Sequence, residues 1–429
     1  MATEWAQVPL GEIVQNFDAR RIPLSSRERE IRRGPYPYYG ATGVMDYVDG
    51  FLFEGLHLLV AEDGSVERPD GKPFLQIVTG QFWVNNHAHV LKGTTDDDTR
   101  FIYYALSTIA IRPFMSGSVQ AKLSQANLNK IPIPYPADKE ARRTIARVLG
   151  TLDNKIELKE RTNETLEEIA QALFEAWFVD FEPVRAKADG REPGFPQKIS
   201  DLFPARLVDS ELGEMPEGWE VATVRDQVAC IKGRSYKSEE LQDSQIALVT
   251  LKSFARGGGY RPDGLKPYKG DYRPEQVVQP GELVIACTDV TQAAEVIGKP
   301  ALVESNDEFE TLVASLDVLV VRPSSRLVSV PFLYCLFRTD FFSHYTYAHT
   351  TGTTVLHLSK DAVSSFRFAL PEKRISDLFA SIASPIFKRI NQFEEEARTL
   401  ANLRDALLRR LISGELRAKD SAQSIEEVF

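Results

Sequence analysis

Apolar residues recur at alternating spacings of four and three along two stretches of the chain, the pattern of a helix that buries one stripe. The seam positions are Leu152, Ile156, Leu166 and Leu173 in the first stretch, and Ile386, Ile390, Phe393, Leu400 and Leu407 in the second. The two series are related by one constant offset of 234 residues. We predict two long helices that pair with each other as an antiparallel coiled coil; pairing with another subunit is the alternative.

Polar residues interrupt both seams, namely Lys159 and Asn163 in the first and Arg404 in the second. Such residues are costly in a continuous dry seam, so we expect them to specify the register or to lie where they reach water. A helix of about 35 residues spans about 50 Å, which is longer than a small module is wide. Each helix is therefore predicted to act as a spacer.

The helices end the two halves of an internal repeat. GSVQAKLSQANLNKIPIPYP (117–136) aligns with GTTVLHLSKDAVSSFRFALP (352–371), and Trp5 is matched by Trp219. Each half is thus a globular module followed by one long helix. The predicted boundaries are 1–137 for the first module, 138–180 for the first helix, 181–215 for a linker rich in Pro, Gly and charge, 216–371 for the second module, 372–414 for the second helix and 415–429 for a C-terminal tail. The alternative for the linker is that Phe195, Leu202 and Phe203 pack it against a module.

Short apolar runs separated by Gly and Pro turns predict the inside of each module. Runs such as HLLVAED from His57, IALVTLK from Ile246 and ELVIACTD from Glu282 are typical of strands. Their number and irregular spacing favour mixed or mainly antiparallel sheets with short helices over regular βαβ units. The predicted fold class is α+β, with two modules alternating with two long helices in a pseudo-two-fold repeat.

Composition places the chain among ordinary soluble proteins, since 43% of its 429 residues are hydrophobic and 26% are charged. No apolar run approaches the length of about 20 residues that a membrane helix needs, and the N-terminus has no signal pattern. The three cysteines are far apart and form no C-x-x-C pair, which favours a reducing compartment. We expect a cytoplasmic protein without a membrane partner.

Motifs of catalysis are absent from the sequence. It contains no phosphate-binding G-x-x-x-x-G-K-[ST] loop, no glycine-rich dinucleotide fingerprint and no N-P-P-[FY] tetrapeptide of an adenine methyltransferase. His87 and His89 form an isolated H-x-H without a third ligand, so no metal site is predicted. The chain is expected to bind a partner and not to be an enzyme.

The net charge of −10 has the wrong sign for a free DNA-binding protein. Basic residues are nevertheless concentrated in two places. Residues 230–273 hold nine Lys or Arg against five acids, and residues 18–33 hold six Arg against three acids. Tyrosines lie among or close to these cations, as in surfaces that hold phosphates and touch bases. The alternative for either segment is a solvated loop.

The residues carry a resemblance to the specificity subunits of type I restriction-modification systems. YPYYGATGVMDYVDGFLFEG (36–55), LHLLVAEDGSV (56–66), the segment 117–136 and the first helix all resemble that family. The resemblance covers nearly the whole chain, in the order recognition domain, helix, recognition domain, helix. The second domain departs from the pattern at its start, where ALVTLKSFARGGGY from Ala247 replaces YPYYGATG.

The resemblance implies a non-catalytic subunit that recognises double-stranded DNA. Each recognition domain would read one half of an asymmetric bipartite target, and the paired helices would set the spacing. It also implies docking of two DNA adenine methyltransferase subunits and, through them, of ATP-dependent restriction subunits. S-adenosylmethionine, ATP and Mg would belong to those partners, with no cofactor in this chain. A protein-binding scaffold with twin modules is the alternative.

Candidate DNA contacts are found in both modules. In the first, the glycine-bearing loop permits close approach of backbone to DNA and offers hydroxyls to bases or phosphates; a tight turn in the module core is the alternative. Lys122 and His357 precede the matched Leu123 and Leu358, so the repeat places them alike. The candidates are Arg32, Arg33, Tyr38, Tyr39, Gly40, Thr42, Gly43, Lys122, Lys252, Arg256, Arg261 and His357.

Overall fold

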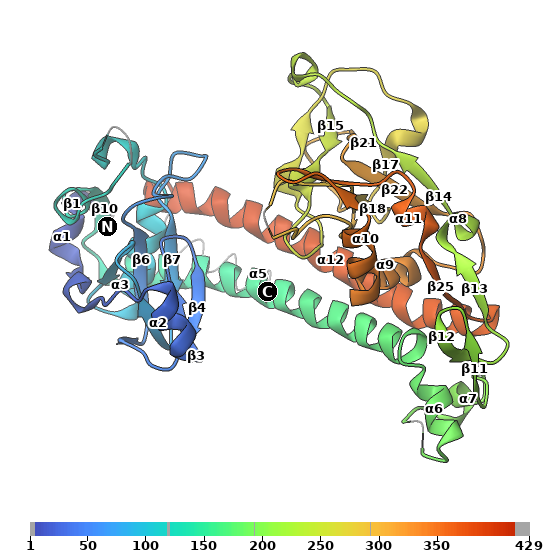
Figure 1. The fold of residues 1–429 in the computed structure, drawn as a ribbon. Coiled ribbons are helices and arrows are strands. Elements are labelled where there is room, and N and C mark those ends of the chain that lie inside the picture. Colours follow the sequence, from blue (N-terminus) through green and yellow to red (C-terminus); the bar gives the residue numbers. More distant parts are fainter. Residues whose placement is uncertain (1–4, 118–120, 193, 292, 417–429) are drawn as a thin grey trace. The chain divides into compact units, whose positions relative to one another are not determined.

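The computed structural model of the chain divides into two units by its internal contacts (Figure 1). Unit 1 comprises residues 1–157 and 398–429, and unit 2 comprises residues 158–397. The described residues are 5–117, 121–192, 194–291 and 293–416. Most of the predicted C-terminal tail and residues 118–120 of the first repeated segment therefore lie outside the described residues.

The two long helices are α5 (Lys139–Phe178) and α12 (Lys373–Ile412). Both are divided between the units, so that unit 1 holds the start of α5 and the end of α12. The prediction had treated each helix as a domain of its own. The helices instead belong to the cores of the units, because their apolar stripes are buried against the modules as well as against each other.

Within unit 2 the helices run antiparallel. The Asn163 side chain on α5 donates a hydrogen bond of 3.2 Å to the carbonyl of Ile390, and the Phe174 ring, further along α5, lies 5.6 Å from that of Phe379. As residue numbers rise on α5, those of their partners on α12 fall. The Lys159 ammonium forms an ion pair with a Glu396 carboxylate at the edge of the seam.

The same direction holds within unit 1. Leu149 on α5 shares a core with Leu411, and Asp153 forms an ion pair of 2.7 Å with Arg404. This confirms the predicted antiparallel pair inside one chain. Among the seam residues, Leu152, Ile390 and Leu400 are buried, and Ile156, Leu166, Leu173, Ile386, Phe393 and Leu407 are partly buried.

Module 1 (5–136) contains two four-stranded sheets in the orders β2-β9-β6-β7 and β4-β3-β8-β5, while β1 pairs with β10. Its strands are β1 (Trp5–Pro9), β2 (Gln15–Asn16), β3 (Arg33–Tyr39), β4 (Val44–Val48), β5 (Phe53–Glu54), β6 (His57–Ala61), β7 (Leu75–Val78), β8 (Gln81–Val84), β9 (Ala88–Lys92) and β10 (Pro132–Pro136). Its α-helices are α1 (Leu10–Ile13), α2 (Ser26–Ile31), α3 (Asp96–Leu106) and α4 (Gln125–Leu128).

Module 2 (219–370) has sheets in the orders β14-β22-β18-β20 and β16-β15-β21-β17, a three-stranded sheet β19-β24-β23, and β13 paired with β25. Its strands are β13 (Glu220–Thr223), β14 (Val228–Lys232), β15 (Ile246–Val249), β16 (Lys266–Pro267), β17 (Val277–Val278), β18 (Leu283–Ala286), β19 (Thr288–Asp289), β20 (Pro300–Leu302), β21 (Thr311–Ala314), β22 (Val318–Pro323), β23 (Thr350–Thr351), β24 (Leu356–Leu358) and β25 (Arg367–Leu370). Its α-helices are α8 (Val224–Gln227), α9 (Val330–Arg338), α10 (Asp340–Ala348) and α11 (Ala362–Ser365).

The two modules share one strand connectivity, since each strand order in module 1 has its counterpart in module 2. Among the pairings of named strands in the described part of the chain, only β3 with β8 and β15 with β21 are parallel, and these occupy corresponding places. The mainly antiparallel α+β fold is thus confirmed, and the repeat seen in the sequence extends to topology.

Corresponding helices also begin in the same way. The Thr95 hydroxyl accepts a hydrogen bond from the Asp98 amide at the start of α3, and the Ser329 hydroxyl accepts one from the Phe332 amide at the start of α9. A hydroxyl at this position satisfies an amide that the first helical turn leaves without a partner. Different residues therefore perform the same capping in both modules.

The segment predicted as a linker (181–215) is folded. It contains α6 (Glu182–Ala188), α7 (Gln197–Ser200) and β11 (Leu207–Ser210), which pairs with β12 (Gly213–Pro216). The Trp177 ring of α5 lies 5.9 Å from Phe195 and 5.2 Å from Phe203. Phe195 and Phe203 therefore anchor the segment to the core of unit 2, as the alternative of a packed linker expects.

Among the described helices, none is both long enough and apolar enough to cross a membrane. The three cysteines are free thiols, and Cys335 is buried. Burial raises the pKa of the Cys335 thiol to about 12, so it is protonated at neutral pH. These thiols behave as small apolar side chains.

Candidate nucleic-acid interface

The glycine-bearing loop of module 1 is the turn between β3 and β4. The Gly40 amide donates a hydrogen bond of 2.8 Å to the Gly43 carbonyl. A Cβ on Gly40 would lie 2.4 Å from the Met45 sulfur, so a larger residue here would have to displace the flexible Met45 side chain. Thr42, at the tip, is exposed and can offer its hydroxyl to a ligand.

Tyr38 was predicted to contact DNA, and its burial contradicts this prediction. Its side chain is 1% exposed and lies in a small core with Val48 and Trp83. Its hydroxyl accepts a hydrogen bond of 2.9 Å from the Leu24 amide. Tyr38 therefore belongs to the scaffold, as in the alternative of a turn packed into the core.

Tyr39 occupies an intermediate position. Its ring meets the Phe82 ring edge-on at 5.9 Å, and burial, followed by the charge of Tyr47, raises the pKa of its hydroxyl. The ring therefore belongs largely to the hairpin base. It is a weaker candidate for a DNA contact than Thr42.

Arg32 and Arg33 lie at the opposite end of the hairpin from the glycine loop. The Arg32 guanidinium is 2.8 Å from an Asp49 carboxylate and stacks over the Trp83 ring at 4.8 Å. Arg33 begins β3 and is exposed. Candidate DNA contacts therefore lie at both ends of this hairpin, with Arg32 and Arg33 at one end and the glycine loop at the other.

The face of β4 carries candidates that the prediction missed. Val44, Met45 and Tyr47 are all exposed, Met45 by 55%, and Ile31 at the end of α2 is exposed by 77%. The strand is at the edge of its sheet. The major groove admits a two-stranded ribbon, and apolar side chains can contact thymine methyl groups. The run VMDYV is apolar enough to attract notice in the sequence, but the sequence alone does not show which of its side chains face solvent.

Lys122 is held by a charged cluster at the edge of the sheet. Its ammonium is 3.0 Å from a Glu62 carboxylate, which also accepts a hydrogen bond of 2.8 Å from Arg21. The hydrogen bond and charge of Glu62 raise the pKa of Lys122. Burial would raise the pKa of Glu62, but hydrogen bonds from Arg21 and Lys122 hold it below its ordinary value. Lys122 is exposed and fixed in place.

His89 ties this cluster to the module. Its ring is 1% exposed, with one nitrogen 2.5 Å from an Asp18 carboxylate and the other 2.8 Å from the Leu123 carbonyl. Both neighbours are acceptors, so the ring satisfies both only when it carries a proton on each nitrogen. Burial would raise the pKa of Asp18, but the hydrogen bond and charge of His89 hold it below its ordinary value.

Asp18, Glu62 and His89 bring three potential metal-ligand atoms within 4.8 Å of one another. Both nitrogens of His89 face other acceptors, and Arg21 and Lys122 neutralise the carboxylates. The arrangement is that of an ion-pair network. His87 and His89, the isolated H-x-H of the sequence, do not share a site, because His87 is exposed and contacts Asp63.

Contacts connect the glycine loop to Lys122. The Gln76 amide donates to the carbonyls of Gly40 and Ala41, and the Asn85 amide donates to the Tyr39 carbonyl. From there Asn85 bonds to His87, His87 to Asp63, and Asp63 approaches Lys122 at 4.0 Å. A chain of side-chain and backbone contacts thus links the turn that carries Gly40, Thr42 and Gly43 to Lys122.

Lys122 and His357 occupy equivalent places. The amide of Leu123 donates a hydrogen bond of 2.8 Å to the Glu62 carbonyl, and the amide of Leu358 donates one of 2.8 Å to the Cys287 carbonyl. Both carbonyls follow the central strands β6 and β18. The same backbone bond therefore presents a lysine in one module and an exposed histidine in the other.

The basic candidates of module 2 lie on one glycine-rich loop. Gly257, Gly258 and Gly259 all have positive φ values of 85°, 113° and 91°, which favour glycine. Arg256 extends beside Glu295 at 3.3 Å and remains largely exposed. Lys252 is also exposed.

Arg261 follows this loop and forms a two-pronged ion pair with Asp263. Its charge is therefore partly matched within its own turn. The Arg261 amide donates a hydrogen bond of 2.9 Å to the Ser253 carbonyl, which holds the two ends of the loop together. Arg261 is exposed and close to Lys252 along the folded loop.

The loop between β19 and β20 contacts the glycine-rich loop, and β19 before it pairs with the strand of His357. The buried Asp289 accepts hydrogen bonds from the amides of Thr291, Val296 and Ile297. Burial would raise the pKa of Asp289, but these bonds hold it below its ordinary value. The Gly257 amide donates 2.8 Å to the Glu295 carbonyl.

Before the loop between β19 and β20, Thr288 pairs with His357 between β19 and β24. The loop between β19 and β20 thus contacts the glycine-rich loop at Gly257, and β19 before it pairs with the strand of His357. Asp289 was not predicted, because a lone aspartate in a strand run gives no signal of its backbone partners.

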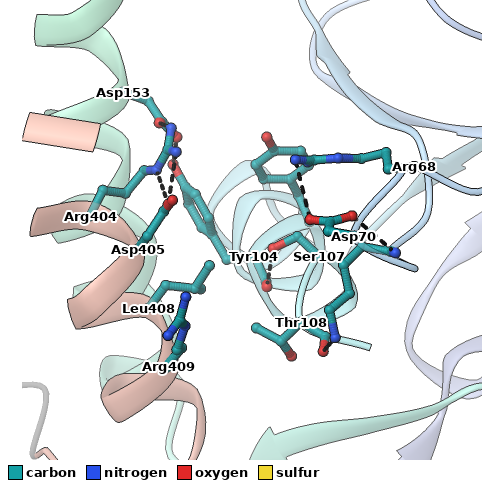
Figure 2. Close-up of a pocket in the computed structure, with 12 residues that line it drawn as sticks. Arg68, Asp70, Tyr104, Ser107, Thr108, Asp153, Arg404, Asp405, Leu408 and Arg409 are labelled. Atoms are coloured by element: carbon teal, nitrogen blue, oxygen red, sulfur yellow. Dashed lines mark hydrogen bonds and ion pairs between the residues drawn. The ribbon is translucent and has the colours of Figure 1, made fainter. Parts of the chain in front are cut away.

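A polar pocket of about 420 Å³ lies in unit 1 where α3 meets the helix pair (Figure 2). The Tyr104 hydroxyl donates to Asp153, and the Arg404 guanidinium lies between Asp153 and Asp405. None of the predicted DNA contacts lines it. Arg404 thus ties the two long helices together through Asp153, and Asp153 also accepts a hydrogen bond from Tyr104 of the module.

Comparisons with known proteins agree on one family. The model of the type I restriction modification DNA specificity domain matches residues 2–168. The type I restriction enzyme MjaIX specificity subunit of Methanocaldococcus jannaschii is 28% identical over 455 aligned positions, covering 97% of this chain and 98% of that one. S.HindORF215P of Haemophilus influenzae, also named as such a specificity subunit, is 41% identical over 133 residues, covering 31% of this chain and 33% of the relative.

A solved structure shares the fold. The type I restriction-modification system S subunit from M. genitalium superposes with a TM-score of 0.54 at 15% identity, covering 95% of this chain and 96% of that one. At this identity the likeness concerns the fold alone.

Proposed function

Because the chain belongs to the family of type I restriction-modification specificity subunits, we infer that it is the subunit that recognises the DNA sequence in such a system. Each module reads one half of a bipartite target in double-stranded DNA. The chain itself supplies recognition, and the chemistry belongs to partner subunits. A protein-binding scaffold is not favoured, because the family model that matches residues 2–168 is that of a DNA specificity domain.

One observation supports this division most directly. The modules share strand connectivity and the backbone bond that places Lys122 and His357, yet these exposed residues differ. A common scaffold that presents different side chains is suited to reading two different half-sites. The net charge of −10 is compatible with this role if contacts with DNA are confined to local basic loops.

The proposal extends to partners and cofactors. Two DNA adenine methyltransferase subunits dock on the chain, and restriction subunits join through them. S-adenosylmethionine, ATP and Mg are held by those subunits and none by this chain. The 40-residue length of each long helix supports a role as a spacer between half-sites, which on one face of DNA lie about 34 Å apart per helical turn.

Adenine methylation tests the proposal. The measurement maps methylated sites across a plasmid library in cells that express the partner methyltransferase with and without this chain. A bipartite motif with a gap of several base pairs, present only with the chain, is expected. Methylation that is absent with the chain, or unchanged without it, would refute the recognition role.

A further inference from the structure

The turn that follows β3 in module 1 and the loop that follows β15 in module 2 begin at equivalent points of the fold. Tyr39 is the last residue of β3 that pairs in parallel with β8, opposite Val84, and Val249 is the last residue of β15 that pairs in parallel with β21, opposite Ala314. The carbonyl of each then accepts a hydrogen bond from the amide that follows its partner strand, at 3.0 Å in module 1 and 2.9 Å in module 2. Tyr39 and Val249 therefore mark the same position in the two modules.

Counting from this position identifies one pair of exposed residues. Thr42 lies three residues beyond Tyr39, and Lys252 lies three residues beyond Val249. Both are exposed. Each is the third residue of a four-residue turn that is closed by a hydrogen bond between its first and fourth residues, although the first residue is the donor in module 1 and the fourth in module 2. The scaffold thus presents a threonine in one module and a lysine at the same place in the other.

The sequence repeat conceals this equivalence. Corresponding residues differ by 210 positions at the two turns, by 230 at β8 and β21, and by 235 at Leu123 and Leu358. Module 2 therefore has 20 more residues than module 1 between the two strands that pair in parallel. The strand register, and not the sequence alignment, matches Thr42 with Lys252.

The turn of module 1 presents apolar groups. Residues 34–67 contain no lysine or arginine. Close to Thr42 along the chain, Val44 is 43% exposed and Met45 is 55% exposed. In the major groove of DNA the group that suits such a surface is the methyl of thymine, which the methyl of a threonine can contact.

The loop of module 2 presents positive charge instead. Residues 250–273 contain six lysines or arginines and two acids. Arg256 and Arg261 are each paired with a carboxylate, but Lys252 forms no ion pair with any residue that the structure describes. An unpaired ammonium on an exposed turn is suited to guanine, whose O6 and N7 are both acceptors in the major groove.

We propose that Thr42 and Lys252 are equivalent specificity-determining residues that read different bases. Thr42, together with Val44, contacts a thymine methyl in the half-site of module 1. Lys252 donates hydrogen bonds to a guanine in the half-site of module 2. This step rests on the proposed function and assigns one base of each half-site to a named residue.

Exchanging the two residues tests the proposal. The chain is co-expressed with its partner methyltransferase, and methylated adenines are mapped across a plasmid library of random sequences. Lys252→Thr should lower the preference for guanine at one position of one half-site by about tenfold. Thr42→Lys should lower the preference for thymine at one position of the other half-site and create a preference for guanine there.

Two further substitutions separate the methyl group of Thr42 from its hydroxyl. Thr42→Val keeps a methyl and should keep the thymine. Thr42→Ser loses the methyl and should weaken the preference for thymine about fourfold, the loss expected for one buried methyl group.

Lys130→Thr is the matched control for Lys252→Thr. Lys130 is exposed on the segment between α4 and β10, so the same substitution removes one surface charge away from the turn. It should leave the motif unchanged. In each exchange variant, the half of the motif that is not altered shows that the chain is folded and assembled.

Three outcomes would overturn the inference and leave the recognition role in place. The first is a bipartite wild-type motif that neither exchange alters, and the second is a loss of thymine preference with Thr42→Val. The third is methylation that falls alike at all sites with Lys252→Thr, because a lysine that holds a phosphate positions the protein and does not read a base. A wild-type chain that directs no bipartite motif would refute the proposed function itself.

Discussion

Tyr38 and Thr42, four residues apart on one hairpin, have opposite roles. The strand β3 directs Tyr38 into a core beside Trp83, while the turn leaves Thr42 exposed. A Cβ at position 40 would displace the exposed Met45 side chain. The candidates for DNA contact in this hairpin are therefore side chains that the scaffold leaves exposed, chiefly on the turn and on β4.

Replacing Tyr38 by phenylalanine tests its assignment to the scaffold. Tyr38→Phe removes the acceptor of the Leu24 amide while it keeps the ring. The free energy of unfolding should fall by about 1 kcal/mol, as measured by urea denaturation. The methylated motif should be unchanged. A motif altered in one half would return Tyr38 to the DNA interface.

The cluster around His89 predicts a dependence on pH. Asp18→Asn removes a nearly buried charge and should lower the free energy of unfolding by about 3 kcal/mol near pH 7. The folded-state pKa of Asp18 is below 3.8, so its contribution is present above that value and is lost as the pH falls through the lower folded value.

The measurement for this prediction is urea denaturation of the wild type and of Asp18→Asn from pH 7 down to pH 3. The difference in unfolding free energy should shrink below about pH 4. Glu12→Gln is the control, since that carboxylate is exposed on the surface of the same module. A difference that stays constant over the range would contradict the account of the cluster.

Among the secondary-structure elements, the sequence predicted best the two long helices, whose apolar residues follow a helical period. Alternating spacings of four and three located α5 and α12 to within two residues at either end. Composition failed for 181–215, because a few aromatic anchors outweigh many polar residues when they enter a core. Burial of Tyr38 and exposure of Tyr47 were equally unpredictable, since both belong to short strands whose partner strands lie elsewhere in the sequence.

The two ion pairs between α5 and α12 should contribute unequal coupling energies to the stability of the protein. Asp153 and Arg404 are partly buried and share Tyr104 and Asp405 as neighbours, whereas Glu396, which pairs with Lys159, is half exposed. A double-mutant cycle to alanine should give Asp153 and Arg404 a coupling of about 1 to 2 kcal/mol.

The same cycle on Lys159 and Glu396 serves as the comparison. It should give about 0.5 kcal/mol, because an exposed ion pair is weakened by solvent. Both energies come from denaturant unfolding. Equal couplings, or a larger value for Lys159 and Glu396, would show that burial does not rank these contacts.

At the scale of the whole molecule, one connectivity occurs twice with different exposed residues. Module 1 presents Thr42, Tyr47 and Lys122, and module 2 presents Lys252 and His357. We therefore expect the exposed residues of module 1 and those of module 2 to act on different halves of one target. The repeat is detectable in the sequence. Contacts between loops that are distant in the sequence, such as that of Gly257 with Glu295, are visible only in the folded chain.

The most direct test of this claim is the methylated motif of two single variants, Tyr47→Ala in module 1 and Lys252→Ala in module 2. Cells express the methyltransferase with each variant or with the wild-type chain, and methylated adenines are mapped across a plasmid library. We predict that the wild type gives a bipartite motif and that each variant relaxes a different half of it. Relaxation of the same half by both variants would contradict the assignment of one half-site to each module.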